Sequence, residues 1–113
     1  MRRRADFDRV FQQGRHNSAR LMAVRSVANE QALSRFGYAI PKRVGNAVVR
    51  NRIRRRLREI LRLLPLREGF DVVITVRQDS AQATFQNLRT ELITLLRRAR
   101  ILDLPNPPPG PRP

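Results

Sequence analysis

A run of basic residues at positions 42–62 constrains the fold of this chain more than any other feature of its sequence. The run contains nine cations and one acid, Glu59, and therefore supplies +8 of the formal net charge of +15. Residues 47–64 overlap it and show helical periodicity, because apolar side chains recur on one face from Val49 to Leu64. The sequence therefore predicts a helix over residues 47–64, with one apolar face and arginines around the rest of its circumference.

The charge of this helix indicates what kind of molecule it binds. Six arginines between positions 50 and 58 repel one another, and a helix tolerates this poorly unless a polyanion or counterions screen them. A merely solvated helix face is the alternative, but such faces usually mix charges of both signs. Guanidinium groups match phosphate oxygens and stack on bases. The sequence therefore predicts a nucleic-acid partner.

Composition excludes several other classes of protein. The 113 residues suffice for one domain, and a hydrophobic content of 41% is too high for a disordered basic tail. The absence of cysteine excludes disulfides, a zinc ribbon and thiol chemistry, and a single histidine, His16, argues against a histidine metal site. No apolar run reaches the roughly 18 residues that a membrane span requires. Residues 1–6 lack the apolar segment of a signal peptide, so we expect a cytoplasmic protein.

The remaining elements follow from periodicity and from turn residues. We expect an α+β domain over residues 1–103 in the order α-β-β-α-β-α, with room for one extra short strand. Besides the basic helix, the expected elements are a helix over 2–13, strands over 19–28, 35–40 and 70–76, and a helix over 84–102. The first two strands are close in sequence, which favours an antiparallel hairpin. Residues 104–113 are rich in proline and are predicted to be an extended or disordered tail.

Two groups of side chains are candidates for binding. At the start of the basic helix, Asn46 suits the N-cap and Gly45 suits a tight turn, while Asn51 lies among arginines and can donate to phosphate or to a base edge. On the first helix, Phe7 and Phe11 are four residues apart beside an arginine run. They can stack on unpaired bases or can simply pack in the core.

The sequence offers no catalytic constellation. A protein nuclease needs clustered carboxylates for metal ions, or a histidine–lysine acid–base pair. Asp6 and Asp8 fall on different faces of their helix, while Asp71 and Asp79 are isolated in the sequence, which favours a solvated strand edge for Asp71. There is also no glycine-rich phosphate loop. We therefore expect the chain to bind nucleic acid without cutting it by itself, and we assign it no catalytic residue and no metal ligand.

Two motifs resemble those of a known family. The first is Phe7-x-x-Val10-Phe11-x-x-Gly14, and the second, after Phe36-Gly37, is Pro41-Lys42-Arg43-Val44-Gly45-Asn46-Ala47-Val48-Val49-Arg50-Asn51-Arg52-Ile53-Arg54-Arg55-x-x-Arg58-Glu59. Together they closely resemble the protein subunit of bacterial ribonuclease P. The similarity extends over residues 2–100, which leaves out only the C-terminal tail.

The resemblance implies a fold and an activity. The fold is a small α-β sandwich, ribosomal protein S5 domain 2-like, in which the basic helix lies in a left-handed β-α-β crossover. The ribonucleoprotein enzyme, an endonuclease, removes the 5′ leader of precursor tRNA by hydrolysis and leaves a 5′-phosphate. Its RNA subunit performs the chemistry with Mg²⁺, and the protein raises substrate affinity and lowers the Mg²⁺ requirement.

The resemblance also implies two binding surfaces, one for the catalytic RNA and one for the single-stranded leader. The residues expected to bind the RNA subunit are Asn46, Arg50, Asn51, Arg52, Arg54, Arg55 and Arg58. The residues expected to bind the leader are Phe7, Phe11, Met22, Val24, Lys42, Arg43 and Arg77. Neither a membrane nor DNA is expected as a partner.

Two other classes remain as alternatives. One is a structural RNA binder similar to a ribosomal protein, which would sediment with ribosomes and leave tRNA ends unchanged. The other is a basic DNA-binding helix protein, which would need a dimerising element. No heptad pattern extends past Leu64 to supply one.

Overall fold

The computed structural model describes residues 3–103 and contains a four-stranded sheet with three helices. In chain order the elements are α1 (Arg4–Gln13), β1 (Arg15–Ser18), β2 (Met22–Ala28), β3 (Arg35–Ala39), η1 (Lys42–Val44), α2 (Ala47–Arg62), β4 (Phe70–Val76), η2 (Gln78–Gln82) and α3 (Phe85–Arg98). The α+β class and the element order are confirmed, and β1 is the extra short strand. The predicted proline-rich tail lies outside the described residues.

The sheet order is β1-β2-β4-β3, so the predicted hairpin between β2 and β3 is wrong. Strand β4 lies between them, antiparallel to β2 and parallel to β3. Its side chains explain the position: Val72, Val73 and Ile74 are all fully buried, so both faces of β4 need cover and only a central strand provides it. The hairpin in the structure is formed by β1 and β2.

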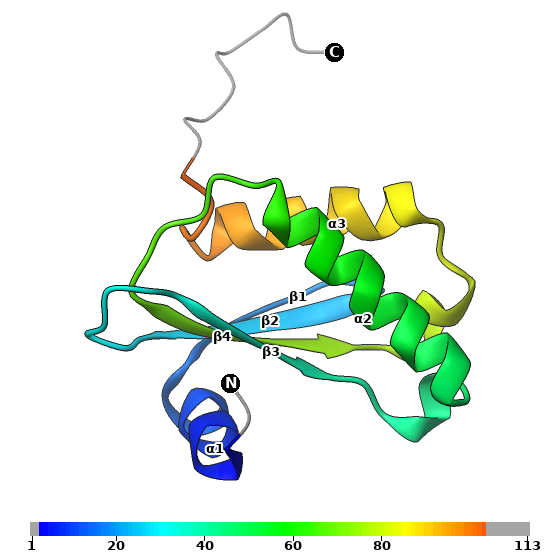
Figure 1. Cartoon of the computed structure of the whole chain (residues 1–113), viewed down its shortest axis with the longest axis horizontal. Coiled ribbons are helices and arrows are strands. Elements are labelled where there is room, and N and C mark those ends of the chain that lie inside the picture. The colour runs from blue at the N-terminus through cyan, green and yellow to red at the C-terminus, as the bar shows by residue number, and fades with distance from the viewer. Residues whose placement is uncertain (1–2, 104–113) are drawn as a thin grey trace, which may run out of the picture.

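The connection from β3 through α2 to β4 is left-handed. In Figure 1, β3 and β4 both run from left to right, β3 lies nearer the viewer, and α2 crosses above them. Nearly all such connections in proteins have the opposite hand. The crossover implied by the family resemblance is therefore present.

The helices cover the two faces of the sheet unequally, as Figure 1 shows: α2 and α3 lie on one face and α1 on the other. The main core lies under α2 and α3, where residues such as Ile53, Leu57 and Leu92 pack against Met22 and Ile74. Helix α1 contributes only one fully buried side chain, Val10. No helix within residues 3–103 is long and apolar enough to cross a membrane.

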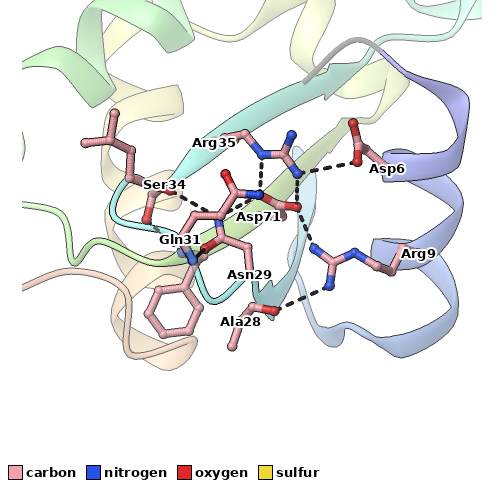
Figure 2. Close-up of polar contacts among 10 residues, drawn as sticks. Asp6, Arg9, Ala28, Asn29, Gln31, Ser34, Arg35 and Asp71 are labelled. Carbon is pink, nitrogen blue, oxygen red and sulfur yellow. Dashed lines mark hydrogen bonds and ion pairs between the residues drawn. The ribbon is translucent and has the colours of Figure 1, made fainter.

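Polar contacts add to the attachment of α1 to the sheet, and Asp71 of β4 is their centre (Figure 2). Its side chain is fully buried, so the expectation of a solvated strand edge is wrong. Arg9 of α1 donates to Asp71 Oδ2 at 2.6 Å, and Arg35 of β3 donates to both carboxylate oxygens, from Nε at 2.8 Å and from Nη2 at 2.5 Å. Asn29 donates to Oδ1 at 2.9 Å, and Arg35 also reaches Asp6 of α1 at 3.4 Å.

The charge state of Asp71 follows from these contacts. Burial alone would raise the pKa of its carboxyl group, but hydrogen bonds from Arg35, Asn29 and Arg9, together with the charge of Arg35, outweigh it and lower the pKa to about 2. The carboxylate in turn raises the pKa of Arg35. Asp71 is therefore ionised at neutral pH and links α1, β3 and β4 through one buried anion.

Candidate nucleic-acid interface

The start of α2 is built as the sequence predicts. Asn46 is the N-cap, and its Oδ1 accepts a hydrogen bond from the backbone N–H of Val49 at 3.0 Å. A Cβ atom on Gly45 would lie only 2.7 Å from Val49 Cγ1, so no larger residue fits there without displacing that side chain. The cap and the close approach fix where α2 begins and therefore the directions in which its arginine side chains point.

The arginines of α2 spread over the whole accessible circumference of the helix. Arg52 and Arg56 reach the segment that leads into α3, where they donate to the carbonyl oxygens of Ala81 at 3.2 Å and Ala83 at 3.4 Å. On the side of β3, the guanidinium of Arg58 lies 5.8 Å from the centre of the Tyr38 ring. Arg52 therefore has a structural role beside the RNA contact that the resemblance implies.

Other side chains on α2 present free donors. Arg55 and Asn51 are exposed, and Asn51 Oδ1 accepts from Arg54 at 2.9 Å, which leaves the Asn51 amide nitrogen available to donate. Within the described residues, the buried Nε atoms of Arg50 and Arg52 have no hydrogen-bond partner. This surface, made of the seven residues predicted to bind the RNA subunit, is called the α2 surface below.

A groove of about 640 Å³ lies on the opposite face of the sheet, beside α1. Phe11 of α1 lines it and keeps 39% of its surface exposed, with the guanidinium of Arg25 at 5.1 Å from its ring centre. Arg43 from η1 and Arg77, which follows β4, line the same groove. The structure thus brings together three of the predicted leader-binding residues from separate parts of the chain; we call this the α1 groove.

Two of the predicted leader-binding residues cannot line the α1 groove. Met22 and Val24 are fully buried in the core under α2 and α3. Successive strand residues point to opposite faces, so the residues of β2 that face the groove are Ala23 and Arg25. The assignment of Met22 and Val24 to leader contact is therefore wrong.

The other two predicted residues lie near the groove without lining it. Phe7 is half-buried on α1, and Lys42 is exposed on η1 next to Arg43. The groove-lining residues that sequence reasoning missed include His16 of β1 and Arg20 in the β1–β2 turn.

A second hollow of about 630 Å³ continues the α1 groove toward the start of α3. The two share Arg20, Arg43, Gln78 and Asp79, and Arg20 lies 3.7 Å from the Asp79 carboxylate. Asn87 of α3 lines its far side. Guanidinium donors therefore line a path from the α1 groove past η1, the turn that directly precedes α2.

The chemistry of these surfaces is that of binding. Guanidinium groups donate to phosphate oxygens, and an exposed ring beside them stacks on a base. Among residues 3–103, no group of three or more histidine, cysteine, aspartate or glutamate side chains could hold a metal ion.

Comparison with known proteins agrees with this geometry. Residues 1–100 match the Ribonuclease P family model. The ribonuclease P protein component of Caldanaerobacter subterraneus subsp. tengcongensis is 33% identical over 105 residues, which cover 91% of this chain and 90% of that protein. The protein component of a Roseiflexus species is 39% identical over 99 residues, with coverage of 85% and 81%.

Solved structures show the same fold. The RNase P protein of Staphylococcus aureus superimposes with a TM-score of 0.85 at 27% identity, covering 91% of this chain and 96% of that one. The RNase P protein of Thermotoga maritima gives a TM-score of 0.80 at 30% identity, with coverage of 87% and 94%. The basic helix, the sheet order and the match along nearly the whole chain lead to one conclusion: this chain belongs to the family of bacterial ribonuclease P protein components.

Proposed function

We propose that this chain binds the catalytic RNA of ribonuclease P through the α2 surface and holds the 5′ leader of precursor tRNA in the α1 groove. The observation that carries the proposal is the composition of the groove, where the exposed Phe11 ring lies among Arg25, Arg43 and Arg77. Arg43 belongs to η1 and lies three residues before the N-cap of α2, so the groove opens beside the helix that holds the RNA.

The groove residues suit a single strand of variable sequence. Arginine forks bind phosphates, which every nucleotide has, and the Phe11 ring stacks on any base because each base has a π-face. Only precursor tRNA carries a leader. Contacts in the α1 groove therefore increase affinity for the substrate and leave affinity for the mature product unchanged.

Mg²⁺ enters the proposal through the RNA subunit. The RNA holds the catalytic Mg²⁺ ions and performs the hydrolysis, which yields a mature tRNA with a 5′-phosphate. The positive charge of this chain, +15 overall, neutralises phosphates that would otherwise need counterions. The protein should therefore lower the Mg²⁺ concentration at which the RNA cleaves.

The test is cleavage of precursor tRNA by the cognate ribonuclease P RNA at low Mg²⁺, with and without the purified chain. Cleavage at the mature 5′ end should require both components, and the chain alone should be inert. Cleavage by the chain alone would overturn the assignment of chemistry to the RNA. If the chain leaves cleavage by its cognate RNA unchanged, the structural RNA-binder alternative is the better one.

A further inference from the structure

A second cluster of arginines lies at the β1 edge of the sheet. Arg15 and Asn17 of β1, with Arg98 and Arg100 at the end of α3, line a hollow of about 430 Å³ together with His16. Among the residues that the structure describes, no acidic side chain lines this hollow. None of these residues belongs to the α2 surface, and only His16 lines the α1 groove. We call this set the edge cluster.

The edge cluster continues the α1 groove around the sheet. His16 lines both hollows. It pairs across the strands with Arg25, so both side chains point to the α1 face, whereas the neighbouring Arg15 and Asn17 point to the α3 face. Within residues 3–103, β1 pairs only with β2, so no other described strand of the sheet blocks a single-stranded nucleic acid that passes over its outer edge.

Arg100 has a left-handed backbone conformation, which at this kind of position is usually adopted by glycine. Its φ is 60°, and it follows the C-cap of α3, with its N–H donating to the Arg97 carbonyl and the next N–H, of Ile101, donating to the Leu96 carbonyl, both at 3.0 Å. This is the Schellman turn, whose left-handed residue is usually glycine because a Cβ is strained there.

Helix stability does not account for an arginine at this position. A cation in the last turn of a helix interacts well with the helix dipole, which is a sufficient reason for Arg98. Arg100 lies beyond that turn, in a left-handed conformation where glycine is the less strained residue. Residues that violate a local rule without a structural gain are typically found at functional sites.

We infer that the leader passes from the α1 groove over the β1 edge and that the edge cluster binds the phosphates of its distal nucleotides. This inference rests on the proposed function of the α1 groove. The inference also fixes the direction in which the leader runs along the protein. The η1 end of the groove adjoins the helix that holds the catalytic RNA, so the nucleotides nearest the cleavage site lie there and the 5′ part of the leader reaches His16 and Arg98.

The experiment uses the holoenzyme assembled from the full chain and its cognate RNA, with three substrates. These are mature tRNA and precursors with leaders of about 4 and about 16 nucleotides, the range that small single-strand-binding domains cover. The variant is Arg98→Gln with Arg100→Gly, where glycine suits the backbone and avoids a folding defect. The matched control is Arg89→Gln with Arg97→Gln, two exposed arginines of α3 that line neither the α1 groove nor the edge cluster.

For the wild type and the control, the longer leader should tighten binding and steepen its dependence on salt. Two phosphate contacts contribute roughly −1.4 to the slope of log K against log salt concentration, at about −0.7 each. The edge-cluster variant should lose this extra slope and the gain in affinity, while it binds the short-leader precursor as the wild type does.

Three other outcomes would overturn the inference. In the first, the variant would retain the gain in affinity that the longer leader gives. In the second, the control would lose that gain equally. In the third, the variant would bind both precursors more weakly to the same extent, because the cluster contacts the catalytic RNA. The proposed function fails in a different way: the wild type would then bind the short-leader precursor no tighter than mature tRNA.

Discussion

The buried anion at Asp71 leads to a quantitative prediction about stability. Replacing Asp71 by Asn removes the charge while it keeps the size of the side chain, so Arg9 and Arg35 lose their common partner. The cost can be worked from the pKa of the carboxyl group, which lies at about 2 against an ordinary value of 3.8. At about 1.4 kcal/mol per unit, this difference is worth about 2–3 kcal/mol in the free energy of unfolding at neutral pH.

The partners of Asp71 keep this cost from being larger. Removing one member of a fully buried ion pair typically costs about 3–5 kcal/mol, because the other charge remains without water. The side chains of Arg9 and Arg35 are about one-third exposed, at 33% and 32%, so they can turn toward solvent. We therefore expect Asp71→Asn to destabilise the protein by about 2–3 kcal/mol.

The pH dependence of the stability difference between the wild type and Asp71→Asn tests whether the charge of Asp71 is its cause. Because folding lowers the pKa of Asp71, its stabilisation is complete above about pH 4 and disappears as the pH falls toward 2. Urea unfolding of both proteins should give a constant difference from pH 5 to 7 and a shrinking one below pH 4. The matched control is Asp103→Asn, which removes an exposed carboxylate 3.8 Å from Arg67 and should cost less than about 1 kcal/mol. A difference below about 0.5 kcal/mol for Asp71→Asn, or one that persists unchanged at pH 2.5, would refute this reasoning.

Further predictions concern the two binding surfaces and α3. Phe11→Ala should weaken holoenzyme binding of precursor tRNA by about 1–3 kcal/mol without affecting binding of mature tRNA. The control Phe85→Ala removes an equally exposed ring on α3 and should affect binding of neither tRNA. Equal losses for both tRNAs with Phe11→Ala would contradict a leader contact. Arg55→Gln with Arg58→Gln should weaken binding of the catalytic RNA and make its salt slope shallower by about 1.4–1.8, which a filter-binding titration over salt concentration measures; an unchanged slope would exclude both arginines from that contact. Arg100→Gly alone should stabilise the free protein by about 1 kcal/mol in urea unfolding, because glycine suits the left-handed conformation, and a loss of stability would mean that the arginine side chain itself supports the fold.

The basic helix and its cap could be predicted from the sequence because their determinants are local. The apolar stripe from Val49 to Leu64 has the helical period, and Asn46 stands where an N-cap must. The C-terminal end of α3 could not be predicted as well from the sequence. Apolar residues continue to Leu102, but the left-handed turn at Arg100 ends the helix at Arg98, and an arginine gives no sign of such a turn.

The order of the strands could not be read from neighbouring residues. Strands β2 and β3 are adjacent in sequence, but the burial of both faces of β4 places it between them, and that preference is satisfied only when the whole sheet assembles. The two faces of β2 were also misassigned, although one signal was present. Arg25 marks the solvated face, so Ala23 shares it, and Met22 and Val24 must lie on the other.

The unequal attachment of the three helices has a consequence for how the molecule moves. Helices α2 and α3 share one apolar core with the sheet, whereas α1 contributes Val10, the contact from Arg9 to Asp71 and the contact of Asp6 with Arg35. Segments with few buried apolar contacts open at a lower free energy than the rest of a domain, so amide hydrogens of α1 should exchange with solvent before those of α2. Since α1 carries Phe11 and forms one wall of the α1 groove, this local opening would free a bound single strand sideways while the arginines of α2 keep their positions.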